Sequence, residues 1–186
     1  MKAKNKTRKP AKSASALAKP IQKRDLIFTR VFHAPVEQVW KAWTDAERVQ
    51  KWWGPQGFSC PVAKMDVREG GRSLVCMRAP KNFGGQDMYS TWTYTKIVPL
   101  REIEYLHHFA DIEGNQVDPA QQGLPPEMPA EVRNRVSFKA VGDDKTEITV
   151  TEFDWPVGQM MEMSKTGMEQ CLDKMAASMS TKGGRA

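Results

Sequence analysis

Hydrophobic residues recur with a helical period near the beginning of the chain. Residues 26–33 are rich in β-branched and aromatic side chains and predict a strand. Val36, Val39, Trp40 and Trp43 follow at i, i+3, i+4 and i+7 and predict a helix that begins at Ala34-Pro35. We expect a second short helix over residues 46–53, started by a capping box of Thr44 with Glu47 and ended by Gly54-Pro55.

From Phe58 onward the period changes to two, which is typical of strands with one buried face. The parity of residues 88–98 is not clear, whereas the other runs predict one antiparallel sheet with a single apolar face. The expected inward positions are Pro61, Ala63, Met65, Val67, Ser73, Val75, Met77, Ile103, Tyr105, His107, Phe109, Val132, Asn134, Val136, Phe138, Thr146, Ile148 and Val150.

Two segments depart from this alternation. Residues 111–130 have no periodicity and contain four prolines, which predicts either a functional lid or a disordered loop. Residues 157–179 predict a long helix, because Met161, Met168, Leu172, Met175 and Met179 recur at helical spacing. A stripe made mostly of methionine can fill irregular gaps and adapt to differently shaped partners.

The pair Trp52 and Trp53 lies at the end of the second predicted helix. Adjacent helical positions are about 100° apart, so only one indole can sit in the centre of a buried face. We expect one indole to anchor the core and the other to lie near the rim. The rim indole then either completes the packing of the helix on the sheet or borders an opening.

Length and composition predict one domain, spanning residues 25–180, between tails of residues 1–24 and 181–186 that we expect to be disordered. Residues 1–24 contain nine of the 28 basic residues and no acidic one, which leaves 19 basic against 22 acidic residues in the remainder. The basic charge therefore belongs to the tail, and the folded domain is not expected to bind nucleic acid specifically. The role of this basic tail stays open.

The chain has no apolar run long enough for a membrane span and no apolar segment of signal-peptide length. Cys60, Cys76 and Cys171 are odd in number and widely spaced, which favours reduced thiols over a disulfide framework. We therefore expect a cytoplasmic protein. The sequence does not determine its oligomeric state.

Short motifs accompany this order of elements, at residues 30–35, 39–45, 52–58, 65–71, 97–99, 109–115 and 167–174. Together they resemble the SRPBCC (START-like, helix-grip) superfamily, in the branch related to the C-terminal domain of the activator of the heat-shock-protein-90 ATPase. The resemblance spans about residues 26–179 and implies an α+β fold, with a curved antiparallel sheet wrapped around a long C-terminal helix. Met168 stands where the family commonly has tryptophan, and Ser73 replaces a frequent aromatic, so both leave more space.

On this geometry a cavity between the sheet and the long helix is the expected ligand site. His107, Asn134 and Glu152 lie on the inward face and are the candidates for acid–base chemistry, with a buried histidine and a solvated glutamate as the alternative. The predicted ligand-binding residues are Trp40, Trp53, Val75, Met77, Trp92, Tyr94, Tyr105, His107, Phe109, Asn134, Phe138, Met161, Met168 and Leu172.

Three functions remain open at this stage. The first is binding of a small hydrophobic or aromatic ligand, of unknown identity and without catalysis. The second is a co-chaperone-like interaction with a chaperone or another protein, and the third is an enzyme of the polyketide cyclase or dehydratase type. No cofactor is expected, and no metal site is expected, because His107 and His108 point to opposite faces of a strand and no phosphate-binding glycine loop is present.

Overall fold

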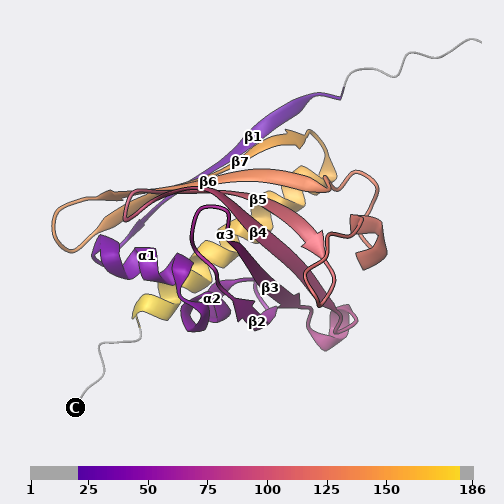
Figure 1. Cartoon of the computed structure of the whole chain (residues 1–186), viewed down its shortest axis with the longest axis horizontal. Helices are drawn as coiled ribbons and strands as arrows, with labels where there is room; N and C mark the ends of the chain where they lie inside the picture. The colour runs from indigo at the N-terminus through magenta and orange to yellow at the C-terminus, as the bar shows by residue number, and fades with distance from the viewer. Residues whose placement is uncertain (1–20, 181–186) are drawn as a thin grey trace, which may run out of the picture.

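The computed structural model describes residues 21–180, which form one sheet and three α-helices (Figure 1). The predicted C-terminal tail and residues 1–20 of the predicted N-terminal tail lie outside the described residues. The first strand begins at Lys23, two residues before the expected start of the domain. The elements in chain order are β1 (Lys23–Phe32), α1 (Val36–Thr44), α2 (Ala46–Trp52), β2 (Ser59–Lys64), β3 (Arg72–Arg78), η1 (Lys81–Phe83), β4 (Asp87–Val98), β5 (Glu102–Ala110), η2 (Pro119–Gln122), β6 (Glu131–Ala140), β7 (Thr146–Pro156) and α3 (Gln159–Ser180).

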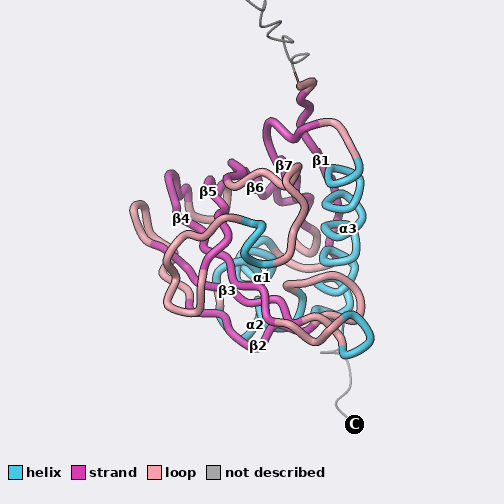
Figure 2. Tube along the Cα trace, turned by 90° about the vertical axis from the view of Figure 1, so that its right-hand side faces the viewer, coloured by secondary structure: helices cyan, strands magenta, loops and turns pink. Residues whose placement is uncertain are grey.

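The sheet has seven strands in the order β1-β7-β6-β5-β4-β3-β2, and every neighbouring pair is antiparallel. Helix α3 crosses one face of the sheet, and its C-terminal end lies near α1 and α2 (Figures 1 and 2). This arrangement confirms the predicted α+β helix-grip fold. None of the helices within residues 21–180 is long and apolar enough to cross a membrane.

The buried face of the sheet follows the predicted parity in β5, β6 and β7. Tyr105, Val136 and Ile148 are nearly inaccessible to solvent, as strict alternation requires. In β4, for which the sequence left the parity open, Trp92 and Tyr94 are buried on this inner face. Antiparallel pairing with β3 and β5 places these side chains opposite other inward residues.

The second strand departs from the expected alternation. β2 ends at Lys64, so Met65 and Val67 follow it rather than continue it, and Pro61 is exposed. A register shift between Ser59 and Val62 explains the difference, because an extra residue reverses the face on which the following side chains lie.

The helix boundaries differ from the predictions in detail. The N-cap of α2 is Asp45, whose carboxylate accepts a hydrogen bond from the Arg48 amide at 3.1 Å. The Thr44 hydroxyl instead donates to the carbonyl oxygen of Trp40, so the predicted capping box does not form. Aspartate is an equally good N-cap residue, and the helix still starts within one turn of the expected place.

The two adjacent indoles separate as expected. Trp52 is fully buried and its indole N–H donates to the carbonyl oxygen of Ala42 at 2.7 Å. Trp53, which is 7% exposed, caps α2 and reaches the space between the sheet and α3. One indole therefore anchors the core and the other borders an opening.

The segment of residues 111–130 has a defined structure that includes η2. The Gln122 amide donates to the carbonyl oxygens of Tyr89 and Ala110 at 3.0 and 2.6 Å, which ties this segment to the ends of β4 and β5. In Figure 1 the segment between β5 and β6 lies at the right-hand edge, away from the C-terminal end of α3. The alternative of a disordered loop is thus not what the structure shows.

Candidate ligand-binding cavity

A cavity of about 250 Å³ lies between the inner face of the sheet and α3. Strands β5, β6 and β7 form its floor, α3 forms one wall, and residues 111–130 contribute Leu124 and Met128. It reaches the surface beside Met163, whose side chain is 56% exposed. Most of the lining is apolar, which is typical of ligand pockets with only a few polar groups.

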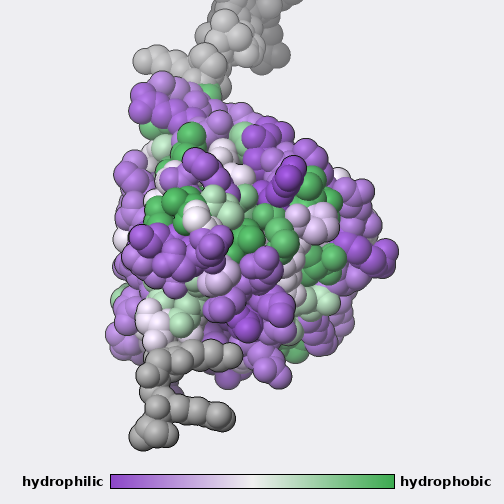
Figure 3. Space-filling view, turned by 90° about the vertical axis from the view of Figure 1, so that its left-hand side faces the viewer, coloured by the Kyte–Doolittle hydropathy of each residue, from purple (hydrophilic) through white to green (hydrophobic). Residues whose placement is uncertain are grey.

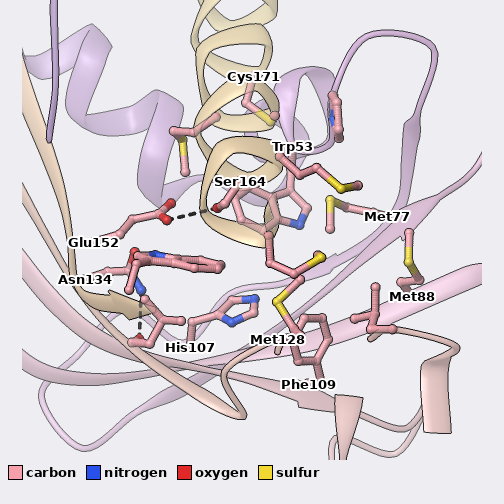
Figure 4. A pocket seen from close by; sticks show the side chains of 18 of the residues that line it. Trp53, Met77, Met88, His107, Phe109, Met128, Asn134, Glu152, Ser164 and Cys171 are labelled. Carbon is pink, nitrogen blue, oxygen red and sulfur yellow. Dashed lines mark hydrogen bonds between the residues drawn. The ribbon is translucent and has the colours of Figure 1, made fainter. Parts of the chain in front are cut away.

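One end of the cavity is polar. Glu152 on β7 and Asn134 on β6 are opposite each other in the strand register and both point inward (Figure 4). The Ser164 hydroxyl of α3 donates to Glu152 Oε2 at 3.1 Å, and Asn134 Nδ2 donates to the carbonyl oxygen of Val132 at 2.9 Å. Side chains from two strands and one helix therefore lie together at this end, and Ser164 is the one of them that donates to the carboxyl group.

Burial raises the pKa of Glu152 from its ordinary value of 4.5 to about 7. Hydrogen bonding from Ser164 and the nearby Trp155 indole lower this pKa, but less than burial raises it. The Trp155 N–H lies close enough to lower the pKa of Glu152, although it has no acceptor at ordinary hydrogen-bonding geometry. Near neutral pH the carboxyl group therefore changes readily between its neutral and ionised forms.

His107 lies in the cavity wall on β5, where its ring packs edge-on against Phe109 with centroids 5.3 Å apart. Burial, helped by the neighbouring His108, lowers the pKa of His107 to about 4. The imidazole is thus neutral at physiological pH. Within residues 21–180 it makes no hydrogen bond to Glu152, so the predicted pairing of these two candidates is not formed.

The other end of the cavity is rich in methionine. Met77 and Met88 lie on the opposite side of the view from Glu152 and Asn134 (Figure 4). Flexible, polarisable thioethers can adjust to the outline of a bound molecule more easily than branched side chains. The six methionines that line the cavity are Met77, Met88, Met128, Met160, Met163 and Met168.

The structure brings together half of the predicted ligand-binding residues. Those that line the cavity are Trp53, Met77, Tyr105, His107, Phe109, Asn134 and Met168. Those that pack elsewhere are Trp40, Val75, Trp92, Tyr94, Phe138, Met161 and Leu172.

Side-chain packing explains these exceptions. Trp92 stacks against Tyr105 with centroids 5.1 Å apart and lies away from the cavity. Tyr94 and Ser73 share a hydrogen bond of 2.8 Å between their hydroxyl groups, so the space expected at Ser73 is occupied by polar contacts. Met168 does border the cavity, as expected from its small bulk relative to tryptophan.

The face of α3 that borders the cavity is rotated from the predicted stripe. Met161 and Leu172 belong to the buried core, whereas positions 160, 163, 164, 167, 168 and 171 line the cavity with helical spacing. Hydrophobic spacing alone did not separate these two adjacent stripes. Ser164 was missed because a serine in a methionine-rich helix looks like a solvent-facing position.

Other residues were missed because they lie outside regular alternation. Leu124 and Met128 belong to an aperiodic segment, although they are among its few large apolar side chains. Trp155 lies near the end of β7, beyond the clearly alternating run. The sequence feature that could have identified Leu124 and Met128 is the presence of large apolar residues in an otherwise polar loop.

No group of three metal-ligating side chains occurs within residues 21–180. Cys171 lines the cavity, and burial raises the pKa of its thiol to about 12. A thiol with such a pKa is a poor nucleophile at neutral pH.

The fold and the cavity define an α+β helix-grip protein with an internal, mostly apolar chamber. The chain belongs to the family of Activator of Hsp90 ATPase homolog 1-like proteins, whose model matches residues 33–180. No curated protein is significantly similar to the chain in sequence.

Solved structures of bacterial proteins share the fold. The solution structure of a Staphylococcus epidermidis protein is 26% identical, with a TM-score of 0.67 over 89% of this chain and 94% of that one. An Arthrobacter aurescens protein is 22% identical, with a TM-score of 0.70 over 86% of this chain and 88% of that one. The AHSA1 protein from Silicibacter pomeroyi is 18% identical, with a TM-score of 0.66 over 84% of this chain and 98% of that one.

Proposed function

We propose that the protein binds a small hydrophobic or aromatic molecule in the cavity between the sheet and α3. The observation that carries this proposal is the unfilled volume itself. Protein interiors are normally packed as densely as organic crystals, and an unfilled space of this size lowers stability unless something occupies it. A cavity of about 250 Å³ with an apolar lining therefore favours a binding role over a purely structural one.

The size of the cavity limits the ligand. An engineered apolar cavity of about 150 Å³ is known to accept benzene. The present cavity is larger, at about 250 Å³, and suits a molecule with one or two rings or a short branched chain. Long-chain lipids would have to extend through the opening beside Met163.

The segment of residues 111–130 supports the proposal as a cover for this chamber. Its Leu124 and Met128 side chains contribute to the lining, whereas Gln122 holds the segment against β4 and β5. The hydrogen bonds that attach it to β4 and β5 lie between Gln116 and Gln122, so the part that carries Leu124 and Met128 can move without unfolding the sheet. This is the arrangement that a ligand-binding lid needs.

Filling the cavity tests the proposal directly. We expect Met168→Trp to reduce binding of 1-naphthol by about tenfold or more, because the larger side chain takes the space of one ring. Affinity is measured by isothermal titration calorimetry, and folding by circular dichroism and thermal unfolding. Lys165→Trp is the matched control, since it adds the same indole to an exposed position of α3.

The control variant should bind 1-naphthol as the parent protein does. Undetectable binding of 1-naphthol and of other one- and two-ring compounds to the parent protein would exclude the proposal. Native mass spectrometry of the purified protein gives an independent answer, because a co-purifying small molecule adds its mass to the protein peak.

A protein-interaction role is the second candidate, suggested by the family description. The face at the α1 end is mostly hydrophilic, and hydrophobic residues gather near its middle (Figure 3). Such a surface can serve a transient contact with a chaperone or another protein. Affinity capture that recovers one chaperone equally from the parent protein and from Met168→Trp would favour this role over ligand binding.

A further inference from the structure

The cavity contains an acidic side chain without a basic partner. Among residues 21–180, Glu152 is the only carboxylate that lines it, and no lysine or arginine does. The other ionisable groups that line the cavity are Tyr105 and His107 on β5 and Cys171 on α3. At neutral pH all three are uncharged, because burial raises the pKa of Tyr105 and of Cys171 and lowers that of His107.

The carboxyl group of Glu152 has few polar partners. Its Oε2 accepts the Ser164 hydroxyl at 3.1 Å, and the Trp155 indole lies nearby without ordinary hydrogen-bonding geometry. Glu152 is only 5% exposed, so little water can solvate its charge. A buried carboxylate in this condition is unfavourable unless a ligand supplies a donor or a positive charge.

Aromatic rings also line the cavity. Trp53, Tyr105 and Trp155 all line it, and a cation is attracted to the face of an aromatic ring. The thioether of Met168 adds a polarisable group without a donor hydrogen. Together these side chains form a site that favours a positively charged group and carries no positive charge of its own.

We propose that the ligand combines a hydrophobic body with a protonated amine, and that the amine pairs with Glu152 at the polar end while the body lies among the methionines. This inference rests on the proposed function and narrows its ligand class. It also predicts that carboxylic acids are rejected, because a second carboxylate beside Glu152 finds no positive group to balance it.

The test uses three molecules with the same ring system: 2-(1-naphthyl)ethylamine, 2-(1-naphthyl)ethanol and 1-naphthylacetic acid. At pH 7.5 we expect the amine to bind about tenfold or more tightly than the alcohol, and the acid to bind most weakly. Isothermal titration calorimetry in two buffers with different ionisation enthalpies should also show proton release, since the amine stabilises ionised Glu152.

Glu152→Gln separates the charge from the shape of the cavity. In this variant we expect the amine to lose its advantage over the alcohol, while affinity for the alcohol changes by less than about threefold. Glu169→Gln, an equal change at an exposed position of α3, should keep the full preference.

Two results would overturn the inference: the alcohol binding the parent protein as tightly as the amine does, or Glu152→Gln retaining the preference. In either case ligand binding in the cavity would still stand. If none of the three molecules binds, both the inference and the proposed function fail. Failure of the inference alone is therefore distinguished from failure of the proposed function by whether the alcohol binds.

Discussion

Helix α3 packs against the rest of the molecule in two different ways along its length. Its C-terminal half contributes Leu172 and Met175 to a core in which both are almost completely inaccessible. Its N-terminal half, from Met160 to Cys171, borders the cavity. Both halves are rich in methionine, so residue type does not decide which becomes a core and which becomes a binding wall.

The neighbouring elements make this difference. Near the C-terminal half, α2 and its aromatic neighbours fill the space above the sheet, with the rings of Trp43 and Trp52 4.7 Å apart. At the other end the segment of residues 111–130 lies beside α3 and contributes Leu124 and Met128 to the cavity wall. A cavity therefore forms where a loop takes the place of a helix.

The largest expected effect comes from truncating a methionine in each half. Met175→Ala should lower the free energy of unfolding by about 2–5 kcal/mol, because it opens a void in a packed core. Met163→Ala should change it by less than about 0.5 kcal/mol, since that side chain is exposed at the cavity mouth. Urea denaturation measures both values, and equal losses would remove the distinction between the two halves.

The next effect concerns the pH dependence that Glu152 creates at the cavity end. Its folded-state pKa is raised from 4.5 to about 7, so the unfolded protein releases its proton first as the pH rises. Stability should therefore fall by about 3 kcal/mol in total between these two pH values and stay constant above them. Glu152→Gln should lack this fall, as seen in urea denaturation at pH 5 and pH 8.

Glu169→Gln provides the reference for the titration of all other carboxyl groups. If the difference in unfolding free energy between Glu152→Gln and the parent protein were the same at both pH values, Glu152 would not have the raised pKa on which this prediction depends.

A smaller effect of opposite sign is expected from His107. Its pKa is lowered from 6.5 to about 4, so the unfolded state takes up a proton first as the pH falls. Stability should drop by about 1–2 kcal/mol between pH 6.5 and pH 5. His107→Gln should remove this drop, whereas the exposed His33→Gln should leave it unchanged. Thermal unfolding across this pH range measures the drop in each variant.

Much of the fold could be predicted because local periodicity controls it. Alternation placed Tyr105, Asn134 and Val136 on the inner face, and helical spacing predicted α1 and α3. The predicted N-cap of α2, Thr44, was wrong by one residue, because the adjacent Asp45 suits the position equally well and takes it. The structure differs where a register shift in β2 reverses the alternation, which no local pattern announces.

The candidate site was less predictable. The sequence identified Glu152 and Asn134 as inward polar residues because parity is a property of single strands. It did not identify Ser164 or Met128, because each reaches the cavity only through the packing of a helix or a loop on distant strands.

The sequence by itself determined the order of elements, the buried face of most strands and the separation of Trp52 from Trp53, since these depend on the period of a short segment. Only the tertiary structure decided which stripe of α3 meets the cavity, that Trp92 and Tyr94 belong to the core, and that Glu152 has Ser164 as a hydrogen-bonding partner but no cation. These features depend on distances between segments far apart in the chain, and such distances are set by how the sheet curves and how α3 packs against it.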